Sequence, residues 1–109
     1  MSTGPIPETR IGQIVSVEEP VGLRNRAWLM TIDFGPLGVK KSVGQFKNLS
    51  QEEIVGRRIV AVVGLGSKRV GNYTSECLVL GTQVNEADHN AGHYPLEPGK
   101  DAKLGDLVG

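Results

Sequence analysis

The sequence predicts an all-β domain built as a small barrel. Fifteen of its 109 residues are glycine and six are proline, which is typical of short strands joined by many turns. Its apolar residues fall in short runs, such as residues 59–65, that contain β-branched side chains and are bounded by glycines. Runs of this kind favour buried strands over helices. The length allows a single domain, residues 1–109, with a modest core.

The first three strands are expected at residues 10–17, 27–34 and 39–46. In the first strand the apolar residues do not alternate cleanly, which indicates a bulge or a coiled strand around Gly12. In the second strand, alternation places four large apolar side chains on one face: Trp28, Met30, Ile32 and Phe34. Two interpretations of Trp28 stay open, because its ring can pack in the core or a dimer interface or can stack on a nucleic-acid base.

A short helix and two further strands are expected next. Ser50 and Glu53 have the spacing of a capping box, which predicts a helix over residues 51–55. The fourth and fifth strands are expected at residues 57–65 and 75–82. Three strands, a helix and two strands is the order of elements in an OB-fold, so we predict a five-stranded OB-fold β-barrel with its helix between the third and fourth strands. The terminal extensions are an N-terminal arm, residues 1–7, and a C-terminal extension, residues 82–109.

The connector between the last two predicted strands, residues 66–75, is basic and rich in hydroxyl groups. Gly66, Gly71 and Asn72 all tolerate positive φ, so they can close a turn in this connector. Such a turn would present Lys68 and Arg69 to solvent. We therefore predict a basic loop that acts as a binding surface.

Charge is unevenly distributed along the chain, although the formal net charge is zero. Residues 38–70 hold seven cations and two acidic side chains, a net charge of +5. Residues 82–109 hold two cations and five acidic side chains, a net charge of −3. This distribution indicates a localised anion site rather than a general polyanion binder. A solvated strand face explains the same scattered lysines equally well.

No catalytic constellation is present in the sequence, and we expect neither enzymatic activity nor a cofactor. The sequence lacks a Gly-x-Ser-x-Gly elbow, a phosphate-binding loop and a Cys-x-x-Cys pair. Cys77 is the only cysteine, and its place in an apolar run favours a buried, inert thiol over a nucleophile. His89 and His93 have the spacing of two metal ligands on one helix, but the neighbouring glycine and proline disfavour a helix. We therefore expect no metal site.

The sequence also lacks signals for membranes or secretion. No apolar stretch is long enough to cross a bilayer, and the N-terminus lacks a basic segment followed by an apolar one. With one cysteine, no intrachain disulfide is possible. We therefore expect a cytoplasmic protein that does not insert into membranes.

The sequence of residues 56–81, GRRIVAVVGLGSKRVGNYTSECLVLG, resembles the end of a known domain. This is the tRNA-binding domain shared by methionyl-tRNA synthetase appendages, free-standing tRNA-binding proteins and the CsaA export chaperones. The most specific part is SKR followed by Ser75 and Glu76 and an apolar strand. Upstream, RIGQI resembles the opening motif of the family, and IDFG with GVKKS resembles its CsaA branch. The resemblance covers residues 8–104 and implies an OB-type barrel that pairs as a homodimer, with both terminal extensions helping the contact.

Charged side chains for phosphate, and hydroxyl and amide groups for base edges, are candidates for RNA recognition on such a barrel. The predicted tRNA-binding residues are Lys40, Lys41, Ser42, Gln45, Lys68, Arg69, Asn72, Ser75 and Glu76. Four of these match the motif of the family residue by residue: Lys68, Arg69, Ser75 and Glu76. The chain lacks the longer basic stretch of tight tRNA binders, so we expect weak or auxiliary binding of tRNA.

The CsaA resemblance implies a chaperone that binds unfolded or pre-export polypeptides, with a secretion motor as a further partner. Such a protein needs an apolar groove, for which the sequence offers aromatic side chains. The predicted peptide-binding residues are Trp28, Phe34, Phe46 and Tyr73. The alternative is a dedicated tRNA-binding protein or a trans-acting cofactor of an aminoacyl-tRNA synthetase.

Overall fold

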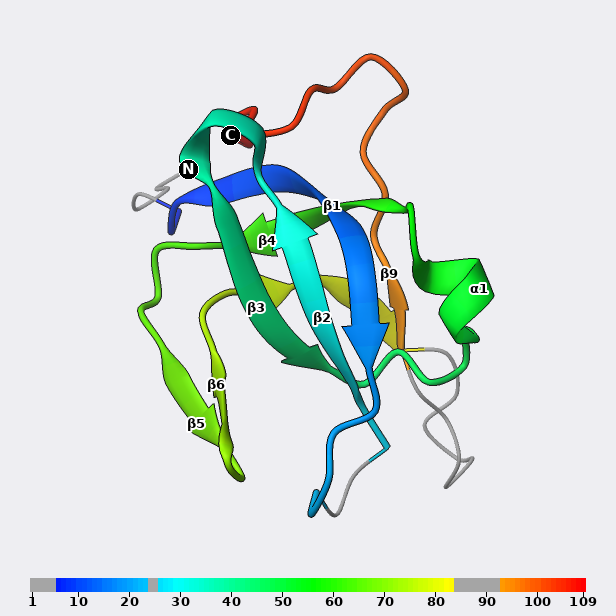
Figure 1. The fold of residues 1–109 in the computed structure, drawn as a ribbon. Coiled ribbons are helices and arrows are strands. Elements are labelled where there is room, and N and C mark those ends of the chain that lie inside the picture. Colours follow the sequence, from blue (N-terminus) through cyan, green and yellow to red (C-terminus); the bar gives the residue numbers. More distant parts are fainter. Residues whose placement is uncertain (1–5, 24–25, 84–92) are drawn as a thin grey trace.

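The computed structural model describes residues 6–23, 26–83 and 93–109 and confirms an all-β fold with a nearly closed, five-stranded barrel (Figure 1). In spatial order, the barrel strands are β3 (Val39–Gly44), β2 (Trp28–Asp33), β1 (Thr9–Glu18), β4 (Arg58–Val62) and β7 (Leu78–Val79). Two hairpins complete the strands: β5 (Lys68–Val70) with β6 (Tyr73–Ser75), and β8 (Gly81–Gln83) with β9 (His93–Pro95). A 3-10 turn, η1 (Gly35–Leu37), joins β2 to β3, and the short helix α1 (Gln51–Ile54) lies between β3 and β4.

β1 is the central strand of the barrel, because its first half pairs with β4 and its second half pairs with β2. The predicted bulge exists, but the register shifts between Ile14 and Ser16 rather than around Gly12. Gly12 has another role. A Cβ atom there would lie 2.6 Å from Ile32 Cγ2 and 2.8 Å from Phe34 Cε1, so glycine lets these core side chains pack directly on the β1 backbone.

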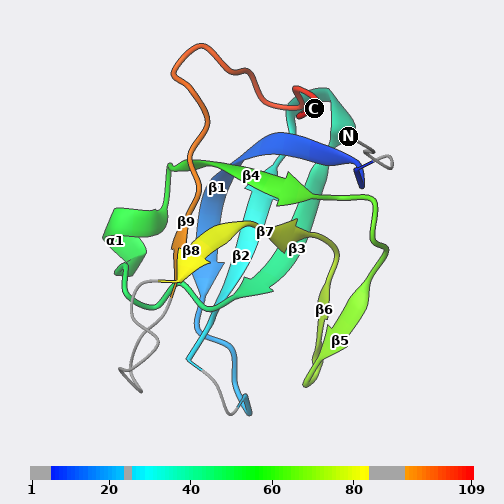
Figure 2. The ribbon, with the colours of Figure 1, turned by 180° about the vertical axis from the view of Figure 1, so that it is seen from behind.

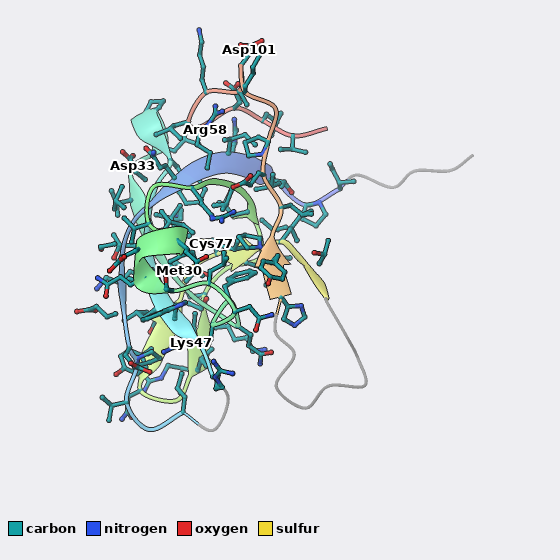
Figure 3. All side chains as sticks on the ribbon, turned by 90° about the vertical axis from the view of Figure 1, so that its right-hand side faces the viewer. Met30, Asp33, Lys47, Arg58, Cys77 and Asp101 are labelled. Carbon is teal, nitrogen blue, oxygen red and sulfur yellow. The ribbon has the colours of Figure 1, made fainter. Side chains whose placement is uncertain are left out.

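The core is one cluster of buried side chains from the barrel strands, α1 and the segments that connect them. The side chains fully excluded from solvent include Ile14, Met30, Ile32, Ile54 and Ile59. Figure 3 shows Met30 and Cys77 in the middle of the molecule. The predicted inner face of β2 is confirmed for Met30, Ile32 and Phe34, whereas Leu29 on the opposite face is also buried.

The helix α1 forms where the sequence predicts it, because its N-terminus is a complete capping box. The Ser50 hydroxyl accepts from the Glu53 amide at 3.2 Å, and the Glu53 carboxylate accepts from the Ser50 amide at 2.9 Å. The helix ends at Ile54, one residue earlier than expected. Since Ile54 is fully buried, this helix closes one end of the barrel.

The region after β4 differs most from the prediction. The expected loop over residues 66–75 is a β-hairpin, and the expected fifth strand is divided among β6, β7 and β8. The division has a local cause. The Ser75 hydroxyl donates to the Cys77 carbonyl at 3.1 Å, and such side-chain bonds compete with a regular strand ladder.

The C-terminal extension packs on the barrel of its own chain. The Gly105 amide donates to the Ile11 carbonyl at 2.7 Å, and the Ile11 amide donates to the Asp106 carbonyl at 3.0 Å. The Arg58 guanidinium donates to the Lys100 carbonyl at 3.0 Å. The start of β1 and the C-terminal end of the chain consequently lie at the same pole of the barrel (Figure 1), the pole to which Arg58 belongs (Figure 3).

Parts of both predicted extensions, residues 1–5 and 84–92, lie outside the described residues. Among the described residues, no helix is long and apolar enough to cross a membrane.

Candidate nucleic-acid interface

The hairpin of β5 and β6 projects from the barrel on the side away from α1 (Figure 1). Val70 pairs with Tyr73, so a two-residue turn of Gly71 and Asn72 joins the strands. Gly71 has a φ of 60°, whereas Asn72 keeps negative φ. Positive φ at the first turn position alone is the type II′ geometry, which matches the twist of a hairpin. The sequence predicted this turn correctly, and of Gly71 and Asn72, which both tolerate positive φ, only Gly71 adopts it.

The two cations of the hairpin point to opposite faces, because successive side chains alternate along a strand. Lys68 lies opposite Ser75, and Arg69 lies opposite the exposed Thr74. Both cations are exposed to solvent. They are therefore placed to contact different groups of a ligand rather than to clamp one phosphate together.

The hairpin is held against the loop that connects β1 and β2. The Tyr73 hydroxyl accepts from the Val21 amide at 2.9 Å. A Cβ atom on Gly71 would lie 2.5 Å from Leu23 Cδ2, so the turn and this loop are in close contact. Since OB-fold barrels bind oligonucleotides on strands 2 and 3 and on the adjoining loops, the hairpin lies in the region where such ligands bind.

Ser75 and Glu76 attach the hairpin to β3 and close the barrel. The Glu76 amide donates to the Lys41 carbonyl at 2.7 Å, and the Lys41 amide donates to the Glu76 carboxylate at 2.8 Å. The Val43 amide donates to the Ser75 hydroxyl at 3.1 Å. The Ser75 hydroxyl and one Glu76 carboxylate oxygen are thus used inside the protein. The buried Ser75 is therefore withdrawn from the predicted RNA surface, whereas Glu76 is half-buried and stays a prediction.

Ser42 and Cys77 form the buried part of the same contact between β3 and residues 75–77. The Ser42 hydroxyl donates to the Cys77 carbonyl at 2.8 Å, and its side chain is buried, so Ser42 is also withdrawn from the predicted RNA surface. Burial raises the pKa of the Cys77 thiol to about 11, and the thiol is therefore protonated at neutral pH. Of the two interpretations of Cys77, the structure favours the buried, inert thiol.

The remaining predicted residues are accessible to different degrees. Those exposed to solvent are Lys41, Gln45, Lys68, Arg69 and Asn72, whereas Lys40 is half-buried. Lys41 lies on β3, and Lys68, Arg69 and Asn72 lie on the hairpin packed against it. We call these four exposed residues, which include side chains on both faces of the hairpin, the basic hairpin surface. Gln45 follows the far end of β3, where its carbonyl accepts from the His93 amide at 3.0 Å.

Three other cations of the basic segment, Lys47, Arg57 and Arg58, are used in structural contacts. Arg57 pairs with Glu97 at 3.0 Å, and Lys47 pairs with Glu19. Arg58 donates to backbone carbonyls of the C-terminal extension. In the described ranges, no ion pair involves the three cations of the basic hairpin surface. The charge that residues 38–70 can offer to an anion is therefore smaller than the sequence suggested.

The four aromatic side chains predicted for a peptide groove do not form one exposed surface. Phe34 and Phe46 are only 1% and 3% exposed and belong to the core. Trp28 is half-buried, packs against the core and donates to the Leu49 carbonyl at 3.0 Å. The Lys47 ammonium lies 3.8 Å from the centroid of the Trp28 ring and covers it. Core packing with a cation–π contact is thus the observed state of Trp28.

Sequence reasoning missed an apolar cleft of about 350 Å³ between the end of β3 and the strands β7 and β8. Phe46 lies in its wall, together with Leu78, Leu80 and the half-buried His93. The only sequence signal for it was the apolar run after Glu76, which we assigned entirely to the core. Leu78 is instead 51% exposed.

The predicted pair of histidines cannot be assessed as a pair, because His89 lies outside the described residues. His93 is part of β9 and bonds through its backbone to β3. Within the ranges that the structure describes, no group of three or more metal-ligating side chains comes together.

The fold and these contacts can be compared with solved structures. The CsaA chaperone of Picrophilus torridus superposes with a TM-score of 0.83 at 30% identity, and the match covers 94% of this chain and 91% of that one. The chaperone CsaA of Bacillus anthracis gives a TM-score of 0.78 at 35% identity, covering 94% and 90%. A methionyl-tRNA synthetase-related protein of Pyrococcus horikoshii gives 0.75 at 17% identity, covering 93% and 88%, which supports the fold alone. No family model matches the sequence.

Proposed function

The chain belongs to the CsaA-like tRNA-binding-domain family, and from this premise we propose that it is a chaperone for unfolded or pre-export polypeptides. The observation that carries the proposal is the likeness to two CsaA chaperones, at 30% and 35% identity, over at least nine-tenths of each chain. The apolar cleft beside β3 supports it, because a chaperone needs accessible apolar surface.

The proposal includes a secondary capacity to bind tRNA on the basic hairpin surface. Lys41, Lys68 and Arg69 supply charge for phosphate, and Asn72 supplies an amide for a base edge or sugar. Affinity for nucleic acid rises with the number of phosphates neutralised, and three exposed cations give only weak binding at physiological salt. This number disfavours a dedicated tRNA-binding protein or synthetase cofactor.

We further propose that the protein acts in the cytoplasm as a homodimer, with a secretion motor as a partner. Two exposed apolar side chains, Ile6 and Leu107, support an interface at the pole where β1 begins and the C-terminal extension ends. A two-fold interface would use this patch on both copies.

The test of the proposed function is suppression of aggregation. A chemically denatured polypeptide is diluted into buffer with and without this protein, and light scattering is followed. We expect suppression at near-stoichiometric ratios that is unchanged by added salt, because burial of apolar surface drives the binding. A full scattering signal at excess protein would contradict the chaperone function.

A further inference from the structure

The two faces of the hairpin of β5 and β6 contact different surroundings. Residues that lie opposite each other in an antiparallel pair share a face, and so does every second residue along a strand. Lys68, Tyr73 and Ser75 consequently share one face. On this face the Ser75 hydroxyl accepts from β3, and the Tyr73 hydroxyl accepts from the Val21 amide at 2.9 Å. The face is therefore turned toward the barrel and the connection between β1 and β2, whereas Arg69 lies on the opposite face.

Residues 19–27 connect β1 to β2, and two contacts hold the described part of this connection against the hairpin. The hydrogen bond from the Val21 amide to the Tyr73 hydroxyl is the first. The second involves the turn, because a Cβ atom on Gly71 would lie 2.5 Å from Leu23 Cδ2. The hairpin turn and the connection lie at the same end of the molecule in both views (Figure 1 and Figure 2). The two contacts thus fix how the connection lies relative to the hairpin.

Arg26 is a cation that this connection brings toward the hairpin. It follows Leu23 by three residues and precedes β2. Three residues of extended chain span at most about 11 Å, so the backbone of Arg26 lies within that distance of the residue that touches the turn. The Arg26 side chain is exposed and forms no ion pair with another described residue. Arg26 lies outside residues 38–70, so the net charge of the basic segment did not include it.

The charges in this region favour an anionic ligand. Arg26 adds an exposed cation to the three of the basic hairpin surface. Of the two acidic side chains where the connection begins, Glu19 is paired with Lys47 and Glu18 is exposed. An arginine guanidinium can bind phosphate through two parallel hydrogen bonds. Because RNA carries a phosphate at every nucleotide, one RNA molecule can contact cations on two neighbouring elements at once.

We infer that Arg26 is a further RNA contact and that Tyr73 is the positioning residue that holds it in place. The Tyr73 hydroxyl holds the connection beside the face of the hairpin that carries Lys68, so that Arg26 and Lys68 bind phosphates of the same tRNA. Tyr73 acts through the Val21 amide and needs no contact with RNA. The inference rests on the proposed tRNA-binding capacity and adds to it a cation and the contact that positions this cation.

The test of Arg26 is a titration of fluorescently labelled tRNA, followed by anisotropy, at salt concentrations from about 50 to about 200 mM. We expect Arg26→Ala to weaken binding about threefold or more and to reduce the slope of log affinity against log salt concentration by about 0.7–0.9. The matched control is Lys100→Ala, which removes the same charge from an exposed side chain in the segment after β9. That segment lies at the opposite end of the molecule from the connection (Figure 1), so we expect the slope to change by less than about 0.2.

The test of Tyr73 is a double-mutant cycle with Arg26. Tyr73→Phe keeps the ring and every cation and removes only the hydroxyl that accepts from Val21. We expect Tyr73→Phe to weaken tRNA binding about twofold and, in this background, Arg26→Ala to weaken it further by less than about twofold. Tyr73→Phe and Lys100→Ala should be additive, which a general loss of structure would not explain. Circular dichroism verifies that each variant is folded.

The outcomes separate this inference from the proposed function. If the unmodified protein does not bind tRNA at about 50 mM salt, the proposed tRNA-binding capacity itself is contradicted. If it binds and Arg26→Ala behaves like Lys100→Ala, the tRNA-binding capacity stands and the inference is overturned. If Arg26→Ala lowers the slope but its effect is the same with and without the Tyr73 hydroxyl, the positioning role of Tyr73 is overturned.

Discussion

The substitution Ser75→Ala separates a structural role from an RNA-binding role at one residue of the most specific part of the sequence motif. In the structure the Ser75 hydroxyl accepts from the Val43 amide at 3.1 Å and donates to the Cys77 carbonyl at 3.1 Å. The side chain is buried, so it presents little surface to a ligand. We therefore expect the substitution to reduce stability while leaving tRNA affinity unchanged.

The magnitude follows from the groups left without a partner. The Cys77 carbonyl retains the Ser42 hydroxyl as a donor, so the main loss is the acceptor of the Val43 amide. An amide without its acceptor costs about 1–3 kcal/mol, and the partly buried position of this bond favours the lower half of that range. In a domain of this size each kcal/mol lowers Tm by about 4–8 °C.

The assay combines urea unfolding with a tRNA titration. The matched control is Thr74→Ala, because Thr74 is the preceding residue, is exposed and points to the opposite face of the hairpin. We expect Ser75→Ala to lose about 1–2 kcal/mol of unfolding free energy, Thr74→Ala to lose less than about 0.5 kcal/mol, and both to bind tRNA within about twofold of the unmodified protein. Unchanged stability together with weaker tRNA binding in Ser75→Ala would refute the structural role.

Three further predictions concern the hairpin cations, the cap of α1 and the buried thiol. In tRNA titrations over a series of salt concentrations, Lys68→Ala and Arg69→Ala should each reduce the slope of log affinity against log salt concentration by about 0.7–0.9. The double substitution should reduce the slope by about the sum of the two. An unchanged slope would exclude the basic hairpin surface as the tRNA site. Ser50→Ala removes the capping hydroxyl of α1 and should lower the free energy of unfolding, measured in urea, by about 0.5–2 kcal/mol. The Ser50 amide and hydroxyl lower the pKa of Glu53, so the stabilisation from its charged form is present above the unfolded pKa near 4.3 and is lost as the pH falls through the folded value. Burial raises the pKa of the Cys77 thiol to about 11. The stability that the buried thiol contributes should therefore decline as the pH rises from about 8.5 toward 11. At about pH 7.5 the thiol should react with iodoacetamide only after the protein unfolds.

Features set by local sequence were the most predictable. The capping box of Ser50 and Glu53 acts over three residues, and the structure has both of its hydrogen bonds. Alternation along β2 likewise placed Met30, Ile32 and Phe34 correctly in the core, because the period of a strand fixes which side chains share a face. The same alternation implied burial for Phe34, yet it was proposed as a peptide contact on the strength of its aromatic ring alone.

Features that depend on contacts distant in sequence could not be predicted in this way. The pairing of Glu76 with Lys41 spans 35 residues, and nothing in either segment shows which backbone group the carboxylate will accept from. The enclosure of Phe46 between Gly44 and Gly81 likewise requires the relative position of two strands that form no ladder with each other. For this reason the sequence located the residues of the basic hairpin surface, but not the contact between β3 and residues 75–77 or the cleft beside that contact.

The most direct test of the chaperone function is a pair of titrations, one with an unfolded polypeptide and one with tRNA, each at about 50 mM and about 200 mM salt. We predict that affinity for the unfolded polypeptide stays the same at both salt concentrations, since apolar burial drives it, while the tRNA affinity is weak and falls by about tenfold or more. Sub-micromolar tRNA affinity at the higher salt concentration, with no binding of the unfolded polypeptide, would contradict the chaperone function and favour a dedicated tRNA-binding protein.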